Sequence, residues 1–542
     1  MDRRKFIKAS GITLAGIAAS GSLLEGCTSE KQIKKVVPSA TGLKTYWGDL
    51  HNHCNITYGH GDMRDAFEAA KEQLDFVSVT PHAMWPDINM LNKEERLKWV
   101  IGYHTSAFKK LRQGNYQKYL DMTKEYNQEG KFVTFVGYEA HSMIAGDHVA
   151  LHKALDAPLI NCSSIEDWKA KFRGQEVFVT PHHMGYQTNF RGYNWNLFTE
   201  GDQTPFVEMY SRHGLAESDQ GDYPYLHDMG PRQWEGTIQC GLDRGNKFGF
   251  IGSTDQHSGY PGSYGDGRVG VLAQGLNRND LWDALKHRHT CCATGDKILA
   301  DFRINDAVMG DVVRANQRRI YINVEAASCI DYVDIVKNGQ SIARISGPLT
   351  PVAPEGEMVH FKIKLQYGWN RENKYVSWDG AIRLNKGRIL GVTPCFRGAA
   401  FTSPQEGETE FHTHVNRILS KSDNAVELKM YTNMNPNTTT DATQAVILEI
   451  EAPKDAILTS DFNGKPISHS VAELLEGSRT HFMRGWLSEA TLFNRAMPES
   501  CYTVEHYMID DKPEKDTDYY YARVRQRDGQ WLFTSPIWVE RN

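Results

Sequence analysis

Short apolar runs alternate with helix-forming stretches through the first half of the chain. Helix formers fill 63–73, where Ala66 and Ala70 have helical spacing, and also 91–129. Four intervening runs are short, apolar and rich in β-branched or aromatic residues, which is typical of buried strands: 76–79, 131–136, 177–179 and 248–251. Because strands and helices alternate, the pattern predicts an α/β domain with a parallel sheet or barrel, over residues 44–300.

The pattern changes after about residue 300. Residues 319–324 and 519–524 alternate between apolar and polar positions, which is typical of half-buried antiparallel strands. Turn pairs such as Asn338-Gly339 agree with hairpins. We therefore expect a β-rich, sandwich-like domain over 301–542, in which 355–505 is either a large insertion or a further domain.

The N-terminus predicts an export signal over residues 1–27. Arg3 and Arg4 precede an apolar run of thirteen residues that ends near Cys27, and a membrane span needs about 20. The segment resembles a twin-arginine signal, and its end resembles a lipoprotein cleavage box, although Glu25 departs from the usual small residue. An ordinary N-terminal helix is the alternative. With a linker over 28–43, the pattern predicts a periplasmic protein, or one anchored through a lipid on Cys27, in a bacterial envelope.

Net charge and cysteine spacing argue against two classes of function, nucleic-acid binding and a structural zinc site. The 542 residues contain 61 Lys and Arg against 67 Asp and Glu, a net charge of −6, which argues against a nucleic-acid partner. Eight cysteines besides Cys27 have irregular spacing and no CxxC pair, which argues against a structural zinc knuckle and leaves disulfides open. Histidine is the unusual residue, because 15 of the 21 lie between His51 and His289.

Histidines and acids follow the predicted strands. In a parallel barrel the carboxyl ends of the strands share one face, so these side chains should converge. Residues i and i+2 of an extended segment point the same way, and imidazole with carboxylate suits zinc, manganese or iron. The candidate metal ligands are His51, His53, His60, His82, Glu139, His148, His182, Asp255 and His257.

Five strings carry a family resemblance. GDLHNH at 48–53, VTPH at 79–82, GYE at 137–139, PHH at 181–183 and STDQH at 253–257 are similar to the motifs of the polymerase and histidinol phosphatase (PHP) superfamily. The likeness is greatest to an exported branch that carries a C-terminal β domain, and it covers roughly 44–310. It implies a distorted (β/α)7 barrel that holds two or three divalent metal ions.

The resemblance also implies individual roles for the candidate ligands. His51, His53, Glu139 and Asp255 would surround one metal; Glu139 would bridge to a second, completed by His148 and His182; and His82, His257 and His60 would hold a third. Alternatives stay open, because His183 competes with His182, and His141 or His152 competes with His148. The usual ligand position six residues after the second histidine is Gly59 here, and Pro81 replaces a common aspartate.

Such a cluster is typical of hydrolysis by a metal-activated hydroxide, and the family favours phosphate esters. Glu139 would bridge the metals, and His213 or a bound water would protonate the leaving group. Arg268 could bind an anionic substrate or form a surface salt bridge. Glu208 is expected to support a metal ligand rather than to bind a metal itself.

Two other function classes remain open. A glycan-acting hydrolase would use the same cluster and the aromatic residues of a long loop, Tyr193, Trp195, Tyr223 and Tyr225, with Trp369 and Trp378 as a platform on the β domain. For all of these aromatics, packing in a core is the competing interpretation. The third class is a non-catalytic metal-containing binding protein. The substrate is in each case a small molecule or a glycan, and the oligomeric state is left open.

Overall fold

The computed structural model describes residues 42–199, 201, 203–221, 229–372, 375–401, 405–410, 412–435 and 441–542. The predicted signal with Cys27, nearly all of the linker, and Tyr223 and Tyr225 lie outside these residues. Within them, no helix combines the length and the apolar character that crossing a membrane requires.

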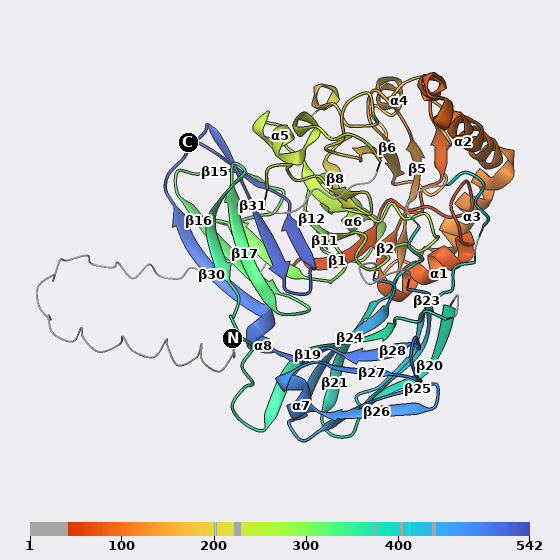
Figure 1. Ribbon diagram of the computed structural model, residues 1–542. Helices are drawn as coiled ribbons and strands as arrows, with labels where there is room; N and C mark the ends of the chain where they lie inside the picture. The colour runs from red at the N-terminus through yellow and green to blue at the C-terminus, as the bar shows by residue number, and fades with distance from the viewer. Residues whose placement is uncertain are drawn as a thin grey trace, which may run out of the picture. The chain divides into compact units, whose positions relative to one another are not determined.

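The strands of the first half pair in both directions (Figure 1). β1, β2 and β4 are parallel neighbours, as are β3 with β5 and β8 with β10, whereas β5–β6–β7 and β1–β11–β12 pair antiparallel. The strands are β1 (Lys44–Asp49), β2 (Phe76–Val77), β3 (His82–Met84), β4 (Val133–Thr134), β5 (Val136–Ala140), β6 (His148–His152), β7 (Val177–Pro181), β8 (Phe206–Ser211), β9 (Gly214–Leu215), β10 (Gly249–Gly252), β11 (Arg268–Ala273) and β12 (Thr290–Ala293).

This arrangement is a mixed α/β fold, and the pairings among the described strands do not show a closed (β/α)7 barrel. One reason is local. The link between β5 and β6 is only residues 141–147, which is too short for a crossover helix, so β6 returns antiparallel to β5. The predicted strand at 177–179 is present in full, and those at 76–79, 131–136 and 248–251 are present in part.

Helices lie between many of these strands. They are α1 (Met63–Gln73), α2 (Lys98–Lys110), α3 (Tyr116–Tyr126), α4 (Ile165–Lys171), α5 (Ile238–Asp243) and α6 (Arg278–Lys286), with short turns η2 (Ile88–Lys93), η3 (Glu95–Leu97), η4 (Leu111–Asn115), η5 (Trp195–Leu197) and η6 (Trp234–Gly236). The Asp62 side chain caps α1 by accepting from Arg64 N, and Ala66 and Ala70 are buried, as their spacing predicts. Gly114, at φ 99°, breaks the long predicted helix between α2 and α3.

The sheet of β1 continues into the C-terminal strands. β12 pairs with β32, so the last strands of the chain extend a sheet that begins at β1. This sheet adds β15 (Val312–Arg314), β17 (Ile330–Lys337), β18 (Gln340–Ser346), β31 (Thr517–Gln526), β32 (Trp531–Thr534) and β33 (Ile537–Glu540), and beside it pair β13 (Leu299–Ile304), β14 (Ala307–Val308), β16 (Arg318–Glu325) and β30 (Thr503–Asp510). A boundary near residue 300 stays a prediction, and strand pairing crosses it.

Residues 358–498 form two further sheets whose strands pair only with one another among the described strands (Figure 1). One contains β19 (Met358–Gly368), β21 (Arg388–Cys395), β24 (Gln444–Pro453), β27 (Arg479–Phe482), β28 (Ala490–Phe493) and β29 (Met497–Pro498); the other contains β20 (Tyr375–Leu384), β22 (Arg417–Lys421), β23 (Ala425–Asn433), β25 (Ile457–Phe462) and β26 (Lys465–Ser470). Helix α7 (Val471–Glu476) lies between β26 and β27, and α8 (Glu499–Tyr502) follows β29. We call this unit the inner sandwich.

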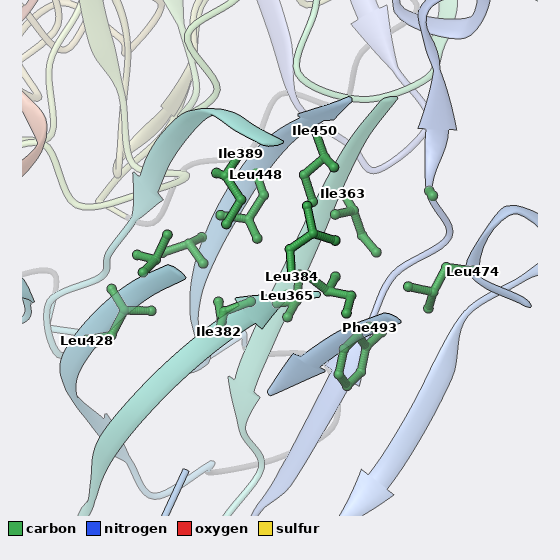
Figure 2. Close-up of a cluster of buried hydrophobic side chains, with 14 of the residues drawn as sticks. Ile363, Leu365, Ile382, Leu384, Ile389, Leu428, Leu448, Ile450, Leu474 and Phe493 are labelled. Atoms are coloured by element: carbon green, nitrogen blue, oxygen red, sulfur yellow. The ribbon is translucent and has the colours of Figure 1, made fainter. Parts of the chain in front are cut away.

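The inner sandwich has its own apolar core. Leu365 of β19, Leu448 of β24 and Ile382 of β20 belong to one buried cluster, whose side chains gather in Figure 2. Alternate positions of these strands face this cluster, as the period of two requires. Trp378 belongs to the same core and is fully buried, so it forms no exposed platform.

Candidate metal centre

All nine predicted ligands are buried, and most of them lie at or just beyond the ends of strands. His51 and His53 follow β1, Glu139 lies on β5, His182 follows β7, and Asp255 lies three residues beyond β10. Side chains separated by up to 204 positions are thus brought together. Among the described residues, the groups whose ligand atoms all lie within 4.8 Å of one another include His53/His82/His257, His51/His182/Glu208/Asp255, His51/His53/Glu139, His82/Glu139/His141 and Asp147/His182/His183.

His51 and His53 point their Nε2 atoms at the same place. These two atoms are 3.2 Å apart, and Asp255 Oδ1 lies 3.0 Å from the His53 atom and 3.5 Å from the His51 atom. Nδ1 of His51 faces Glu208 Oε2 at 2.9 Å, and Nδ1 of His53 faces the Thr80 carbonyl at 2.7 Å. Each Nδ1 therefore has an acceptor for its proton, which leaves the Nε2 lone pairs facing the shared centre.

Glu139 lies between two pairs of histidines. Its Oε1 is 3.0 Å from His182 Nε2 and 3.2 Å from His141 Nδ1. Its Oε2 is 3.2 Å from His82 Nε2 and 3.7 Å from His53 Nε2. Each carboxylate oxygen of Glu139 therefore faces a different set of imidazoles.

A third group of histidines stacks on one side of the cluster. The ring of His53 lies 3.8 Å from that of His82 and 4.4 Å from that of His257, measured between centroids. Tyr58 stacks on the other face of His82 at 3.5 Å. One nitrogen from each of the three histidines lies within reach of a common point.

Several atoms of this cluster are buried without a hydrogen-bond partner. They are Glu139 Oε2, Asp255 Oδ2, both ring nitrogens of His182, and His183 Nδ1. Burying polar atoms without partners is costly, and such atoms are rare in folded proteins. Here they belong to imidazoles and carboxylates that face one another, which is the donor set of a zinc, manganese or iron site. The residues present therefore fit divalent cations.

The charges of the cluster are strongly coupled. Burial lowers the pKa of His51, but Asp255 and Glu208 outweigh it and raise that pKa to about 10. Burial raises the pKa of Glu139 well above its usual range, and it lowers the pKa of His53 to about 4. His51 and His213 outweigh burial at Asp255 and hold its pKa well below normal. Protons on such groups are those that a bound cation displaces.

Backbone strain concentrates at the same place. Asp255, His183 and Arg191 have φ values of 47°, 55° and 67°, in the left-handed region that side chains with a Cβ rarely adopt. Strain of this kind clusters at functional sites, where surrounding contacts hold it.

The remaining predicted residues have varied surroundings. His213 Nε2 lies 3.3 Å from Asp255 Oδ2, at the edge of the cluster. His60 Nε2 lies 3.4 Å from Glu408 Oε1. His148 is buried on β6, where its Nδ1 faces the Gly146 carbonyl at 2.9 Å and its ring packs on Tyr193. His141, the alternative candidate for the ligand position given to His148, makes the contact with Glu139.

Arg268 is not placed to meet a substrate. Its side chain is fully buried, and its Nη2 donates to the Gly262 carbonyl at 2.7 Å and to Gln73 Oε1 at 2.8 Å. These bonds fix the turn that follows His257. Arg268 therefore has a structural role, and the expectation that it contacts an anionic substrate is wrong. The other competitor for the His148 position, His152, packs between Tyr138 and Phe172.

Three site residues were not predicted as principal candidates. Asp147 Oδ2 accepts from Arg191 Nε at 2.8 Å and lies 2.8 Å from His141 Nδ1. His141 could have been found, because Glu139-Ala140-His141 repeats the i, i+2 pattern that selected His51 and His53. Arg191 lies in an irregular loop and has no such signal.

The link between β21 and β22 reaches the cluster from the inner sandwich. We call it the covering segment, 396–416, of which 402–404 and 411 lie outside the described residues. The Phe401 ring lies 4.3 Å from that of His60, and Glu408 Oε1 accepts from Tyr103 OH at 3.3 Å. Thr413 donates to the Ser258 carbonyl, next to His257. The inner sandwich thus contributes side chains beside the candidate ligands.

The aromatic residues considered for glycan stacking are mostly internal. Tyr193 and Trp195 are buried in a core with Phe248, where the Trp195 and Phe248 rings stack at 4.7 Å. They pack in the interior and do not line a pocket mouth. The eight described cysteines are all unpaired, so the structure contains no disulfide among them.

No family model matches the sequence. Uncharacterized proteins of Chlamydia muridarum and Chlamydia trachomatis are each 27% identical to it, over 154 and 165 residues. The matches span about a quarter of those relatives, 25% and 26%, and 25% and 27% of this chain. A solved two-domain protein of Bacteroides vulgatus, described as containing a predicted PHP-like metal-dependent phosphoesterase, is 12% identical with a TM-score of 0.31. That comparison covers 80% of this chain and 97% of the other.

Proposed function

We propose that this chain is a metal-dependent hydrolase that acts on phosphate esters. The observation that carries the proposal is the convergence of buried, unpartnered ligand atoms: Glu139 Oε2, Asp255 Oδ2 and the two nitrogens of His182. A purely structural cluster would satisfy these atoms with hydrogen bonds. Resemblance to the PHP motifs favours phosphate esters within the wider class of hydrolases.

The contacts suggest which residues would hold the metals. His51, His53 and Asp255 would provide the first set of ligands, and Glu139 would join it to a second set with His182 and His141. His82 and His257 would complete a third. Divalent metals held in this way activate water as a nucleophile near neutral pH and polarise the bond that breaks.

We assign roles toward the substrate to two further side chains. Arg191 carries its charge beside Asp147 and is partly exposed, so its guanidinium can orient an anionic ester. His213 lies 3.3 Å from Asp255 Oδ2 and can hold a proton for the leaving group. Glu208 holds His51 through Nδ1 and so keeps the Nε2 atom directed at the metal.

The test combines metal analysis with turnover. Purified protein should contain at least two equivalents of zinc, manganese or iron and hydrolyse 4-nitrophenyl phosphate or bis(4-nitrophenyl) phosphate. In Glu139→Gln and Asp255→Asn, turnover should fall about 100-fold or more, because a direct ligand exceeds the 10–100-fold effect of the groups behind it. His287→Gln changes an exposed histidine at the C-cap of α6, serves as the control, and should retain activity.

The same assay separates the alternatives. Turnover of polysaccharides but of neither phosphate ester would favour a glycan-acting hydrolase. Stoichiometric metal with no turnover of any ester or glycan would favour a metal-containing binding protein. Absence of bound metal in protein that is otherwise folded would overturn all three.

We also propose where the protein is located in the cell. The twin-arginine pair and Cys27 support export to a bacterial envelope, with a lipid anchor on Cys27. Labelling with a radioactive fatty acid, compared between the natural chain and Cys27→Ser, tests the anchor.

A further inference from the structure

A second cavity lies apart from the candidate metal centre. Its volume is about 280 Å³, and none of the candidate metal ligands lines it. Strands β19, β21 and β24 of the inner sandwich form one part of the wall. The turn between β31 and β32 and the link from β16 to β17 form another. Cavities between modules of this kind are preferred places for small-molecule sites.

The lining is predominantly cationic. Five basic side chains face two carboxylates, Asp441 and Asp528. Three of the five are matched by close ion pairs: Lys364 with Asp528, Arg397 with Asp441, and Lys362 with Glu325, each at 2.7 Å. The charges that remain are those of Arg495 and Arg527.

These two arginines are held by backbone carbonyls. Arg495 donates its Nε to the Leu475 carbonyl and its Nη2 to the Pro351 carbonyl, both at 2.8 Å. Arg527 donates to the carbonyls of Pro348 and Leu349, and its nearest ion-pair contact, with Asp331, is 4.0 Å long. The guanidinium groups are thus positioned without a close carboxylate.

Other lining groups suit a polar organic molecule. Gln366, Asn494 and Gln530 add amide groups to the wall, and Thr443 adds a hydroxyl. Arg397 Nε is buried without a hydrogen-bond partner. Cys395 and Ala445 supply a small apolar surface between these groups.

We propose that this cavity binds a small hydroxylated organic anion, about the size of a monosaccharide, through Arg495 and Arg527. Guanidinium groups bind phosphate, sulfate and carboxylate oxygens strongly and in pairs of hydrogen bonds, so each of these anionic groups fits the same position. The cavity volume lies near the lower end of ligand sites, about 300–1,000 Å³, which favours a single sugar-sized unit. The hydroxyl groups of that unit would meet the amides.

Isothermal titration calorimetry tests the proposal with four probes. Glucuronate should bind the natural full-length protein and Asp255→Asn, and glucose 6-phosphate, itself a phosphate ester, is titrated into Asp255→Asn, which should not hydrolyse it. Neutral glucose should bind at least about tenfold more weakly than either anion, and the difference between the two anions in Asp255→Asn identifies the preferred group. Inorganic phosphate, which has no hydroxylated body, should also bind more weakly than glucose 6-phosphate. Equal binding of glucose and both anions would overturn the role of charge.

Variants locate the binding. Arg495→Gln and Arg527→Gln should each weaken binding of the preferred anion about tenfold or more, because a charge-assisted hydrogen bond is lost. Ser328→Phe keeps both arginines and fills the cavity, so it should abolish binding. Arg388→Gln removes an exposed arginine of β21 that pairs with Glu451, and it should bind normally. Thermal unfolding of each variant checks that it is folded.

The site is separable from the metal centre. Asp255→Asn should lose metal and turnover yet bind the anion with unchanged affinity. Loss of anion binding in Asp255→Asn, with normal binding in the folded Ser328→Phe protein, would place the anion at the metal centre and overturn the proposal. Absence of heat with both anions at millimolar concentration would show that the cavity holds water only.

Discussion

At the scale of single residues, the cluster depends on how each imidazole is held from behind. Glu208 faces Nδ1 of His51, the Thr80 carbonyl faces Nδ1 of His53, and Asp147 faces Nδ1 of His141. At His51 and His53 these partners fix both the ring orientation and the nitrogen that remains available, whereas Nδ1 of His141 also lies 3.2 Å from Glu139 Oε1. Loss of such a partner should therefore weaken metal binding, although less than loss of the histidine itself.

Glu208→Gln tests this at one position. The amide keeps the size of the side chain but removes the charge that holds the His51 proton, so affinity for the bound metal should fall about 10–100-fold. Competition with a chelator of known affinity measures the change. Glu235→Gln, an exposed carboxylate on η6, should leave the affinity unchanged. A Glu208→Gln protein with normal metal affinity would show that His51 is oriented by other contacts.

At the scale of elements, the strands differ in what they contribute. β5 carries Glu139 to the centre of the cluster, whereas the neighbouring β6 buries His148 and His152, which have no ion pair among the described contacts. Burial lowers the pKa of His148 to about 3 and that of His152 to about 4. The histidines of β6 should therefore affect stability more than chemistry.

This difference predicts a pH dependence. In the unfolded chain both side chains take up protons below about pH 6.5, while the folded protein resists protonation until about pH 4, so stability is lost as the pH falls through this window. For His152 the loss at pH 5 is about 2 kcal/mol. Urea unfolding at about pH 6.5 and about pH 4 should show that His152→Leu loses less free energy of unfolding between these two pH values than the natural protein does. Equal losses in the two proteins would contradict a buried, neutral His152.

The covering segment is the second element for which we predict the effect of a substitution. Phe401 packs against His60 and near His257, at 4.3 and 6.4 Å between ring centroids. Phe401→Ala should raise KM for the ester about tenfold, which corresponds to loss of about 1.4 kcal/mol of apolar contact beside the cluster. Metal content should not change. A rise in KM with loss of metal would instead make Phe401 a support for the ligands, and unchanged KM would contradict its place at the substrate.

At the scale of the whole molecule, the two halves of the sequence share structure. Strand β32 completes the sheet at β12, and the Ser535 hydroxyl accepts from Phe250 N on β10. Buried Glu217 pairs with Arg523 at 2.6 Å and accepts from Tyr521 OH at 2.5 Å. The last strands therefore support the half that carries the ligands.

A truncated protein tests this dependence. Residues 42–300 alone would lose the β32 edge and two partners of Glu217, and breaking a buried ion pair costs about 3–5 kcal/mol. We expect this fragment to be aggregated or to lack a cooperative unfolding transition by circular dichroism. A soluble fragment that unfolds cooperatively and binds metal would show that the N-terminal half folds independently.

More of the site residues than of the strand pairings could be predicted from the sequence. His51, His53, Glu139, His182 and Asp255 were predicted because each follows an apolar strand. Arg191 and Glu408 were not, because irregular loops bring them to the cluster and neither has a periodic signal. Hydrophobic patterns predicted the strands themselves, but pairing direction depends on link length and on distant partners. The antiparallel return of β6 and the pairing of β12 with β32 were therefore not predicted.

Anomalous X-ray scattering from crystals of the metal-loaded protein, recorded at the zinc, manganese and iron edges, shows whether the clustered histidines and carboxylates share metal ions. We expect at least two peaks, bounded by His51, His53, Glu139, His182 and Asp255, with Glu139 in contact with both. Peaks only elsewhere, or a cluster without any peak in protein that contains metal, would contradict this expectation.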